Sequence, residues 1–378
     1  MQYISKKVGD SRVVWLKSKN RFIVLQKPAF DVFTCLANGR SEEETAKWFS
    51  ENYYVSREEA LVFIYDIYEN IKQLKANNLL AEYPKTNNID LSRFESLHSN
   101  LTKKYLVFGK RIQFSYSNSW LMDMVHPGLA HLEINAEEIA DVHFFLFQGA
   151  DELILKINND RFFRWPVKNS EYFKGSVLLQ LLNFLYGLND KDWMGAFHAA
   201  AVSKNNQAVL ISAPSGFGKS TLSALLVAKG LNLISDDLVP VSRKHQQIFP
   251  LPAGISVKPG ASEMLSAYFP ELKNAKTRLN TSTGKDVTYI APASKIVPKT
   301  ATVKAILFPE FNKNVDFEWN KVDNISVLND FITESWIAGN ENSVSTFLDW
   351  FFQLPCYRLR YNSSEMAVQK IQELFGSL

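Results

Sequence analysis

The pattern of apolar and polar positions changes along the 378 residues, and each pattern predicts a different kind of structure. Residues 1–84 begin with two short apolar runs, Val13–Leu16 and Phe22–Leu25, which predict strands joined by a polar turn. Apolar residues then recur every three to four positions, which predicts three helices, the first over residues 28–37. Ser41 with Glu44 and Ser56 with Glu59 have the spacing of capping boxes and should begin the second and third helices.

Residues 85–190 have a strand-like pattern. Five aromatic-rich segments alternate apolar and polar positions and predict an antiparallel sheet: 105–108, 111–116, 143–147, 152–157 and 161–165. The apolar run 177–186 contains Gln180 and Asn183 and is too short to span a bilayer, so we interpret it as a buried helix. His126 and His131 flank a Pro-Gly turn without further ligands nearby, and we interpret them as packing or surface residues. We expect this β-rich region to pack on the domain that follows.

Residues 191–378 have an α/β pattern. A strand over 207–213, a glycine-containing loop over 214–219, a helix over 220–229 and a strand over 231–235 follow one another directly, with Gly230 after the helix. Farther along, the pattern predicts a buried strand at 303–308, helices at 325–337 and 343–354, and a strand at 356–361. Asn362 with Glu365 should cap the last helix. The fold class is therefore α/β around a P-loop core, with an added antiparallel β region and a small N-terminal α+β domain.

The loop Ala213–Ser220 matches the Walker A pattern, except that Ala213 replaces the first glycine. Gly216 and Gly218 allow the backbone to bend so that successive N–H groups converge on phosphate oxygens, at the positive end of the following helix. Lys219 should reach the β- and γ-phosphates, and the Ser220 hydroxyl should bind Mg²⁺. The residues expected to contact a nucleotide are Ser215, Gly216, Phe217, Gly218, Lys219, Ser220 and Thr221. The alternative is a glycine-rich turn without a ligand.

Two carboxylates, Asp236 and Asp237, follow the strand after the loop helix. In a right-handed βαβ unit the carboxyl ends of both strands open on one edge, so both side chains should face the phosphates. One carboxylate can hold Mg²⁺ and the other can accept a proton from an attacking hydroxyl. A pair that only caps a turn is the alternative. His198 lies upstream in an expected strand over 194–202, where a lone histidine is more often a packing residue than a catalytic one.

The segments HAAAV, VLISAPSGFGKSTL and LISDDLVPV are together similar to the HPr kinase/phosphorylase family and its relatives, over about residues 193–258. The resemblance implies a serine kinase whose nucleotide site is like that of phosphoenolpyruvate carboxykinase. It also implies that His198 orients groups or relays protons at the phosphoryl group, that Asp236 is the catalytic base, and that Asp237 joins Ser220 on the metal.

A proline-containing segment, Pro250–Pro259, resembles a lysine-bearing segment of HPr-kinase-related proteins found in peptide-modifying gene clusters. The resemblance implies that Lys258 contacts the transferred phosphate, and a solvated surface lysine is the alternative. The polar stretch 276–289 could be a substrate or lid loop in which Arg278 or Lys285 clamps charge, or it could be an ordinary solvated loop.

The strand and helix pattern of residues 1–84 is winged-helix-like and resembles the PqqD family. That resemblance implies binding of the leader of a ribosomally made precursor peptide, which would be added as an extra strand. Winged helices also bind DNA, but 42 Lys and Arg nearly balance 39 Asp and Glu, so a nucleic-acid or membrane partner is not indicated. A structural accessory role without a ligand remains open.

Composition adds limits of its own. Two distant cysteines, Cys35 and Cys356, indicate neither a disulfide framework nor a zinc site, and reduced thiols fit a cytoplasmic protein. The polar residues Met1–Asp10 predict no signal peptide. We therefore expect an ATP- and Mg²⁺-dependent kinase acting on a Ser or Thr hydroxyl of a peptide or protein. A small-molecule kinase of the same fold and a nucleotide-switched binding protein are the alternatives, and a homo-oligomer is compatible with either.

Overall fold

The structure is a computed structural model that describes residues 2–74, 101–135, 137–158, 161–274, 278–279, 286–292, 299–333 and 335–378. The chain divides into two compact units: Met1–Ala81 with Ile337–Gln353, and Glu82–Trp336 with Leu354–Leu378. The predicted division at residues 84 and 190 remains a prediction. No helix in the described ranges is both long and apolar enough to cross a membrane.

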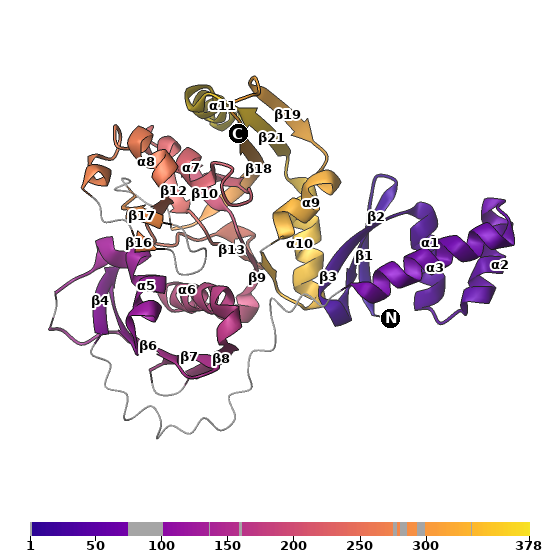
Figure 1. Cartoon of the computed structure of the whole chain (residues 1–378), viewed down its shortest axis with the longest axis horizontal. Coiled ribbons are helices and arrows are strands. Elements are labelled where there is room, and N and C mark those ends of the chain that lie inside the picture. Colours follow the sequence, from indigo (N-terminus) through magenta and orange to yellow (C-terminus); the bar gives the residue numbers. More distant parts are fainter. Residues whose placement is uncertain are drawn as a thin grey trace. The chain divides into compact units, whose positions relative to one another are not determined.

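The smaller unit is built on an antiparallel sheet of order β1-β2-β3, formed by β1 (Tyr3–Val8), β2 (Ser11–Leu16) and β3 (Arg21–Gln26) (Figure 1). Strand β1 is absent from the sequence-based prediction because its YISKKV sequence is mostly polar in its second half. The short helix η1 (Lys17–Lys19) joins β2 to β3. Helices α1 (Lys27–Ala37), α2 (Glu42–Tyr53) and α3 (Arg57–Gln73) follow, and both predicted capping boxes are present.

A helix from far along the chain completes this unit. Helix α10 (Glu341–Gln353) contacts β1, and the Phe347 ring packs edge-on against Phe22 with ring centroids 5.6 Å apart. Ion pairs of Lys6 with Asp349 and of Lys17 with Glu341 lie at its surface. The apolar periodicity of α10 predicts the helix but cannot show which sheet it covers.

In the larger unit, a five-stranded sheet has the order β4-β5-β6-β7-β8. Its strands are β4 (Leu101–Val107), β5 (Lys110–Tyr116), β6 (Val142–Gln148), β7 (Glu152–Ile157) and β8 (Arg161–Pro166). The prediction of a purely antiparallel sheet is wrong at one pair, because β5 and β6 are parallel. Parallel neighbours need a crossover connection, which α5 (Ser119–Leu129) and η3 (Ala130–Leu132) supply. The expected Pro-Gly turn is also wrong, since Pro127 and Gly128 lie within α5.

Helix α6 (Ser170–Tyr186), preceded by η4 (Val167–Asn169), is largely buried, as predicted. Gln180 and Asn183 are buried in it and both donate to Asp190 in η5 (Asp190–Asp192), at 2.8 and 2.7 Å. His126 is buried and its Nδ1 lies 2.9 Å from the Tyr105 hydroxyl. This contact agrees with a packing role for that histidine.

The central sheet of this unit carries the Walker A-like loop Ala213–Ser220. Its strands run in the order β12-β10-β11-β18-β14-β13-β9, and β21 pairs with β18 and with β19. They are β9 (Trp193–Phe197), β10 (Ala200–Lys204), β11 (Gln207–Ile211), β12 (Asn232–Ser235), β13 (Val239–Ser242), β14 (Gln247–Ile248), β18 (Ala301–Phe311), β19 (Glu318–Val322) and β21 (Cys356–Tyr361). Helices α7 (Lys219–Ala228), α9 (Asn324–Ile332) and α11 (Ser364–Ser377) belong to this part, and β20 (Trp336–Ile337) leads to the smaller unit.

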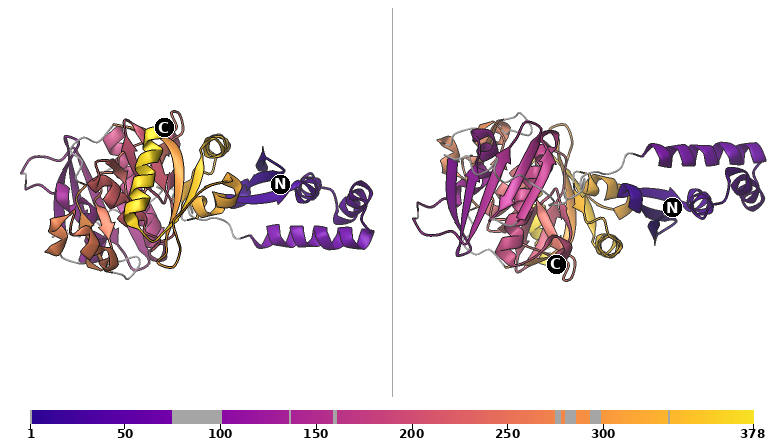
Figure 2. Two further views of the ribbon diagram at one scale, coloured as in Figure 1. Left: turned by 90° about the horizontal axis from the view of Figure 1, so that it is seen from above. Right: turned by 90° about the horizontal axis from the view of Figure 1, so that it is seen from below.

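The core next to the loop is mostly aliphatic, with side chains from β10, β11, α7, β18, β21 and α11 buried together. Leu222 and Leu226 of α7 are fully buried there, and each contributes about 1.5–3 kcal/mol by leaving water. In Figure 2, α11 (yellow) ends the chain beside this sheet. Its cap is Ser363, which accepts from the Met366 N–H at 3.4 Å, so the predicted Asn362–Glu365 cap is wrong by one residue.

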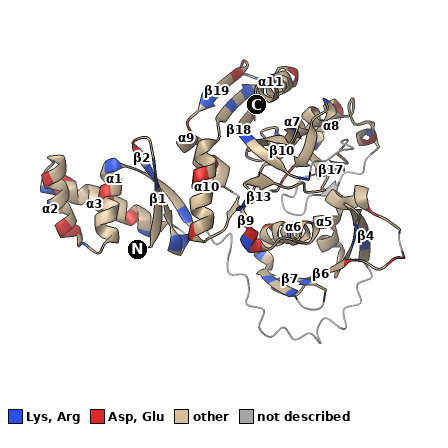
Figure 3. Cartoon of the chain, turned by 180° about the vertical axis from the view of Figure 1, so that it is seen from behind, with Lys and Arg blue, Asp and Glu red and all other residues tan. Residues whose placement is uncertain are grey.

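A small third sheet of order β15-β17-β16 lies on the path between the Asp pair and β18. It comprises β15 (Ile255–Val257), β17 (Asp286–Ile290) and β16 (Arg278–Leu279), with α8 (Pro259–Leu265) and η6 (Pro270–Lys273) between them. Both cysteines are buried and neither forms a disulfide. Lys and Arg are interspersed with Asp and Glu over the described chain (Figure 3), as the balanced composition predicts.

Candidate functional site

The Walker A-like loop lies between β11 and α7, at the carboxyl end of β11. Gly216 and Gly218 have φ of 103° and 93°, values that L side chains rarely adopt, so the glycines predicted for the bend are the residues that make it. Gly218 is the N-cap of α7 and offers no side-chain cap. The N–H groups of the first helical turn, which includes Ser220 and Thr221, therefore suit an anion.

The last residues of β21 and β18, Tyr361 and Phe311, lie against this loop. A Cβ added to Gly218 would lie 2.8 Å from the Tyr361 hydroxyl and 3.5 Å from the Phe311 Cβ. The Phe311 N–H also donates to the Phe217 carbonyl at 3.3 Å. The close approach of Tyr361 is a second reason, besides φ, for glycine at this position.

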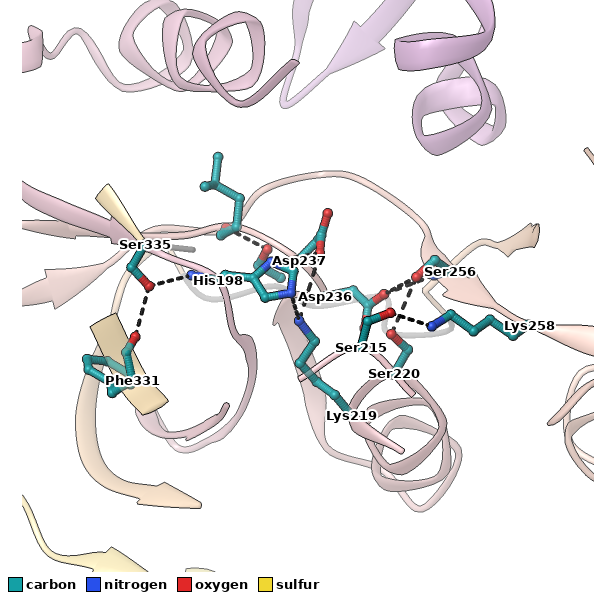
Figure 4. Close-up of polar contacts among 12 residues, drawn as sticks. His198, Ser215, Lys219, Ser220, Asp236, Asp237, Ser256, Lys258, Phe331 and Ser335 are labelled. Carbon is teal, nitrogen blue, oxygen red and sulfur yellow. Dashed lines mark hydrogen bonds and ion pairs between the residues drawn. The ribbon is translucent and has the colours of Figure 1, made fainter. Parts of the chain in front are cut away.

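His198 interrupts the strand that the sequence predicts over 194–202. The segment divides into β9 and β10, which pair with different partners: β9 with β13, and β10 with β11 and β12. The His198 N–H leaves the ladder and donates to Ser335 Oγ at 3.1 Å, and Ser335 Oγ donates to the Phe331 carbonyl at 2.9 Å. The prediction of one continuous strand is therefore wrong, and the break at His198 brings its side chain to the site (Figure 4).

Lys219, His198 and Asp237 form a connected group. Lys219 Nζ lies 2.8 Å from His198 Nε2, and His198 Nδ1 lies 3.3 Å from Asp237 Oδ1. Lys219 Nζ is itself 3.9 Å from Asp237 Oδ1. An ammonium can only donate, so it requires Nε2 of a neutral ring to accept, which leaves the Nδ1–H to donate to Asp237.

Asp236 faces a different set of partners. Its carboxylate is only 3% exposed, and Oδ2 accepts from the Ser256 N–H at 2.9 Å and from Ser256 Oγ at 3.0 Å. Ser256 Oγ also lies 3.4 Å from Ser220 Oγ. Asp236 Oδ1 is buried and has no hydrogen-bond partner among the described residues. The two carboxylates therefore have separate environments, one fixed by Ser256 and one paired with His198.

The pKa values of the two carboxyl groups move in opposite directions. Burial raises the pKa of Asp236, against hydrogen bonds from Ser256 and the charge of Lys219. Desolvation also acts to raise the pKa of Asp237, but the positive charges of Lys219, Lys174 and Lys258 hold it below its ordinary value. A pair with diverging pKa values is typical of a functional site.

Lys258 directly follows β15, and its side chain reaches the loop. Its Nζ donates to Ser215 Oγ at 2.7 Å, so the predicted lysine and a predicted loop residue lie together. The side chain of Arg278 lies outside the described residues, as does Lys285, and neither can be placed at the site.

Sequence reasoning missed Ser256, Lys174 and Tyr289. Lys174 comes from α6, where burial acts to lower its pKa, but the charges of Tyr289, Asp237, Glu171 and Asp236 raise it. Burial has the opposite effect on Tyr289: it raises the pKa of the hydroxyl, while the charge of Lys174 acts to lower it. No local pattern marks Lys174 or Tyr289, because each comes from a segment distant from the loop. Ser256 lies two positions before Lys258 and was within reach of the same argument.

The residues fit a nucleotide with a divalent cation. Loop N–H groups, Lys219 and Lys258 suit phosphate oxygens, while the Asp237 carboxylate and the Ser220 hydroxyl are hard oxygen ligands. No group of three or more His, Cys, Asp or Glu side chains that could hold a metal occurs in the described ranges. Mg²⁺ bound by few protein oxygens and by substrate phosphates agrees with this sparse ligand set.

Comparison with known proteins yields little. No family model matches the chain, and no curated protein matches it. Among solved structures, the chain is similar to the Hpr(Ser) kinase/phosphatase from Coxiella burnetii, with 14% identity and a TM-score of 0.24, over 48% of this chain and 99% of that one. A TM-score this low does not establish a shared fold. The case for a function therefore rests on the residues of the site.

Proposed function

We propose that this protein is an ATP- and Mg²⁺-dependent kinase that transfers the γ-phosphoryl group to a Ser or Thr hydroxyl of a peptide or protein. The observation that carries the proposal is the pair of differently held carboxylates beside a phosphate loop. Asp236 is buried with one oxygen unpartnered, and Asp237 is joined through His198 to the loop lysine. A protein that only binds a nucleotide needs one carboxylate for the metal, whereas transfer to a hydroxyl also needs a proton acceptor.

Each residue has a role in this proposal. Asp236 accepts the proton of the acceptor hydroxyl, whose oxygen forms the new bond to the γ-phosphorus as the bond to the β–γ bridging oxygen breaks and ADP leaves. Lys219 and Lys258 hold the phosphate charge, and His198 orients Lys219 and Asp237. Ser220 and Asp237 would hold Mg²⁺, which when bound neutralises charge on the phosphates.

The acceptor that we propose is a ribosomally made precursor peptide. In the smaller unit, β1 and β3 are the two edges of the three-stranded sheet, and Val24 of β3 is 42% exposed. An extended peptide can add to such an edge by main-chain hydrogen bonds. Binding the peptide on the same chain as the proposed kinase site would raise the effective concentration of the peptide at that site.

The deciding experiment is transfer of label from γ-³²P-ATP to peptides encoded beside the gene. Wild type and Asp236→Asn are compared with Asp316→Asn, which changes an exposed aspartate in the loop after β18. Label with wild type and Asp316→Asn but not with Asp236→Asn supports the kinase and the base. ATP binding without transfer to any peptide or small molecule would instead indicate a nucleotide-switched binding protein.

A second experiment tests the peptide partner. Binding of a fluorescent peptide is measured for wild type, Val24→Lys and Val62→Lys; Val62 is an exposed valine of α3 in the same unit. Weaker binding with Val24→Lys alone supports capture at β3. Equal weakening by both changes would contradict capture at this edge, and transfer to a free serine analogue with no peptide preference would favour a small-molecule kinase.

A further inference from the structure

Strand β15 carries a serine that fixes one oxygen of Asp236. The Ser256 N–H and hydroxyl both donate to Oδ2, at 2.9 and 3.0 Å. Two hydrogen bonds to one oxygen fix the orientation of the carboxylate plane. The other oxygen of this carboxylate, Oδ1, is also buried and has no hydrogen-bond partner among the described residues.

The same strand also contacts the phosphate loop. Ser256 Oγ lies 3.4 Å from Ser220 Oγ at the start of α7, and Lys258 Nζ lies 2.7 Å from Ser215 Oγ in the loop. The strand that binds Asp236 through Ser256 therefore also contacts Ser220 through Ser256 and contacts Ser215 through Lys258 (Figure 4).

The position of β15 is itself fixed by its backbone. Ser256 pairs with Tyr289 of β17, and the Gly254 N–H donates to the Gly128 carbonyl at 2.7 Å. A Cβ at Gly254 would lie 2.7 Å from the Ile290 carbonyl oxygen. Any other residue at this position would therefore push the start of β15 away from β17. The backbone of Ser256 is thus fixed by strand pairing, and a residue that positions a reactive group needs such a fixed backbone.

We propose that Ser256 is a positioning residue that holds Asp236 so that Oδ1 receives the proton of the acceptor hydroxyl. The inference rests on the proposed kinase function. Ser256 acts through Asp236 and does not itself contact the reacting atoms. Because a misplacement of about 1 Å in a reacting group can cost about 100-fold in rate, loss of both the hydroxyl and its contact with Ser220 should slow transfer strongly.

The test compares Ser256→Ala and Ser256→Thr with Ser266→Ala. Ser266 is a half-buried serine of the same unit whose hydroxyl donates to the Glu263 carbonyl at 2.7 Å, so this control also loses one hydrogen bond. Ser256→Ala should lower kcat at least about tenfold, with KM for ATP and Mn²⁺ affinity within about twofold of wild type. Ser256→Thr should restore kcat to within about threefold, and Ser266→Ala should leave kcat unchanged.

A double-variant cycle separates positioning from a general structural effect. In an Asp236→Asn background, Ser256→Ala should cause no further loss of transfer, because the residue it acts through is already gone. A kcat within twofold of wild type, equal losses of ATP affinity and kcat, or the same loss in the Asp236→Asn background would each overturn the proposal.

A wild type that transfers no phosphate refutes the proposed kinase without deciding whether Ser256 holds Asp236. That link is then measured by the Tm changes of Ser256→Ala, Asp236→Asn and the double variant. Non-additive changes support it, and additive changes overturn it.

Discussion

Lys219 Nζ lies 2.8 Å from His198 Nε2, so the lysine that begins α7 and the histidine between β9 and β10 form one hydrogen-bonded pair. Lys219 is 8% exposed, and His198→Ala removes a neutral acceptor from this buried ammonium. We expect a loss of about 1–3 kcal/mol in the free energy of unfolding and a fall of at least about 100-fold in transfer. Thermal unfolding and label transfer measure the two effects, with the exposed His245→Ala as control. Unchanged transfer with His198→Ala would remove His198 from the mechanism.

Gly218 should be irreplaceable for two separable reasons, its φ of 93° and the Tyr361 hydroxyl 2.8 Å from an added Cβ. Gly218→Ala should weaken ATP binding more than tenfold and destabilise the fold by about 1–3 kcal/mol. Adding Tyr361→Phe removes the steric part and should recover some affinity. Gly230→Ala, with φ of 95° and open space around it at the other end of α7, should cost stability but leave ATP affinity unchanged. Calorimetric titration measures the affinities, and equal affinity losses at both glycines would contradict this account.

Ser56 begins α3 with a full capping box, in which its hydroxyl accepts from the Glu59 N–H at 3.2 Å and its own N–H donates to the Glu59 carboxylate at 2.9 Å. Ser56→Ala should lower the stability of the smaller unit by about 1 kcal/mol, while Ser56→Asp retains a capping oxygen. Hydrogen exchange of amides in the first turn of α3 reports the change directly. If Ser56→Asp speeds amide exchange as much as Ser56→Ala does, loss of the capping oxygen is not the cause of the destabilisation.

His143 should make the larger unit less stable in acid. Burial, with a smaller effect of Lys156, lowers its pKa from 6.5 to about 4, and Nε2 lies 2.8 Å from Ser115 Oγ. Between pH 6.5 and about 4 the unfolded chain binds a proton that the folded chain does not, so stability falls as pH falls through this window. The loss is at most about 3 kcal/mol and is complete below the folded pKa. Denaturant unfolding from pH 7 to 4 should show a flatter pH dependence for His143→Gln, and an unchanged slope would exclude His143 as the cause.

Local spacing predicted the elements that form from neighbouring residues. The strand, loop and helix around Lys219, both capping boxes, and the helix containing Gln180 were predicted from the sequence, because each depends on contacts within a few positions. The parallel pair β5–β6, the break at His198 and the placement of α10 beside β1 were not, since each depends on a partner far along the chain.

The candidate site shows the same division between local and distant contacts. The bend at Gly216 and Gly218 and the order of His198, the loop and the Asp pair could be predicted from residue types alone, because glycine's backbone freedom and helix capping operate within one turn. The tertiary fold, in contrast, sets the pairing of Asp236 with Ser256, 20 residues away, and of Asp237 with His198. It also brought the charge of Lys174 from α6 to both carboxylates. Such contacts form when packing of the core closes long loops, and no local pattern encodes which side chains then meet.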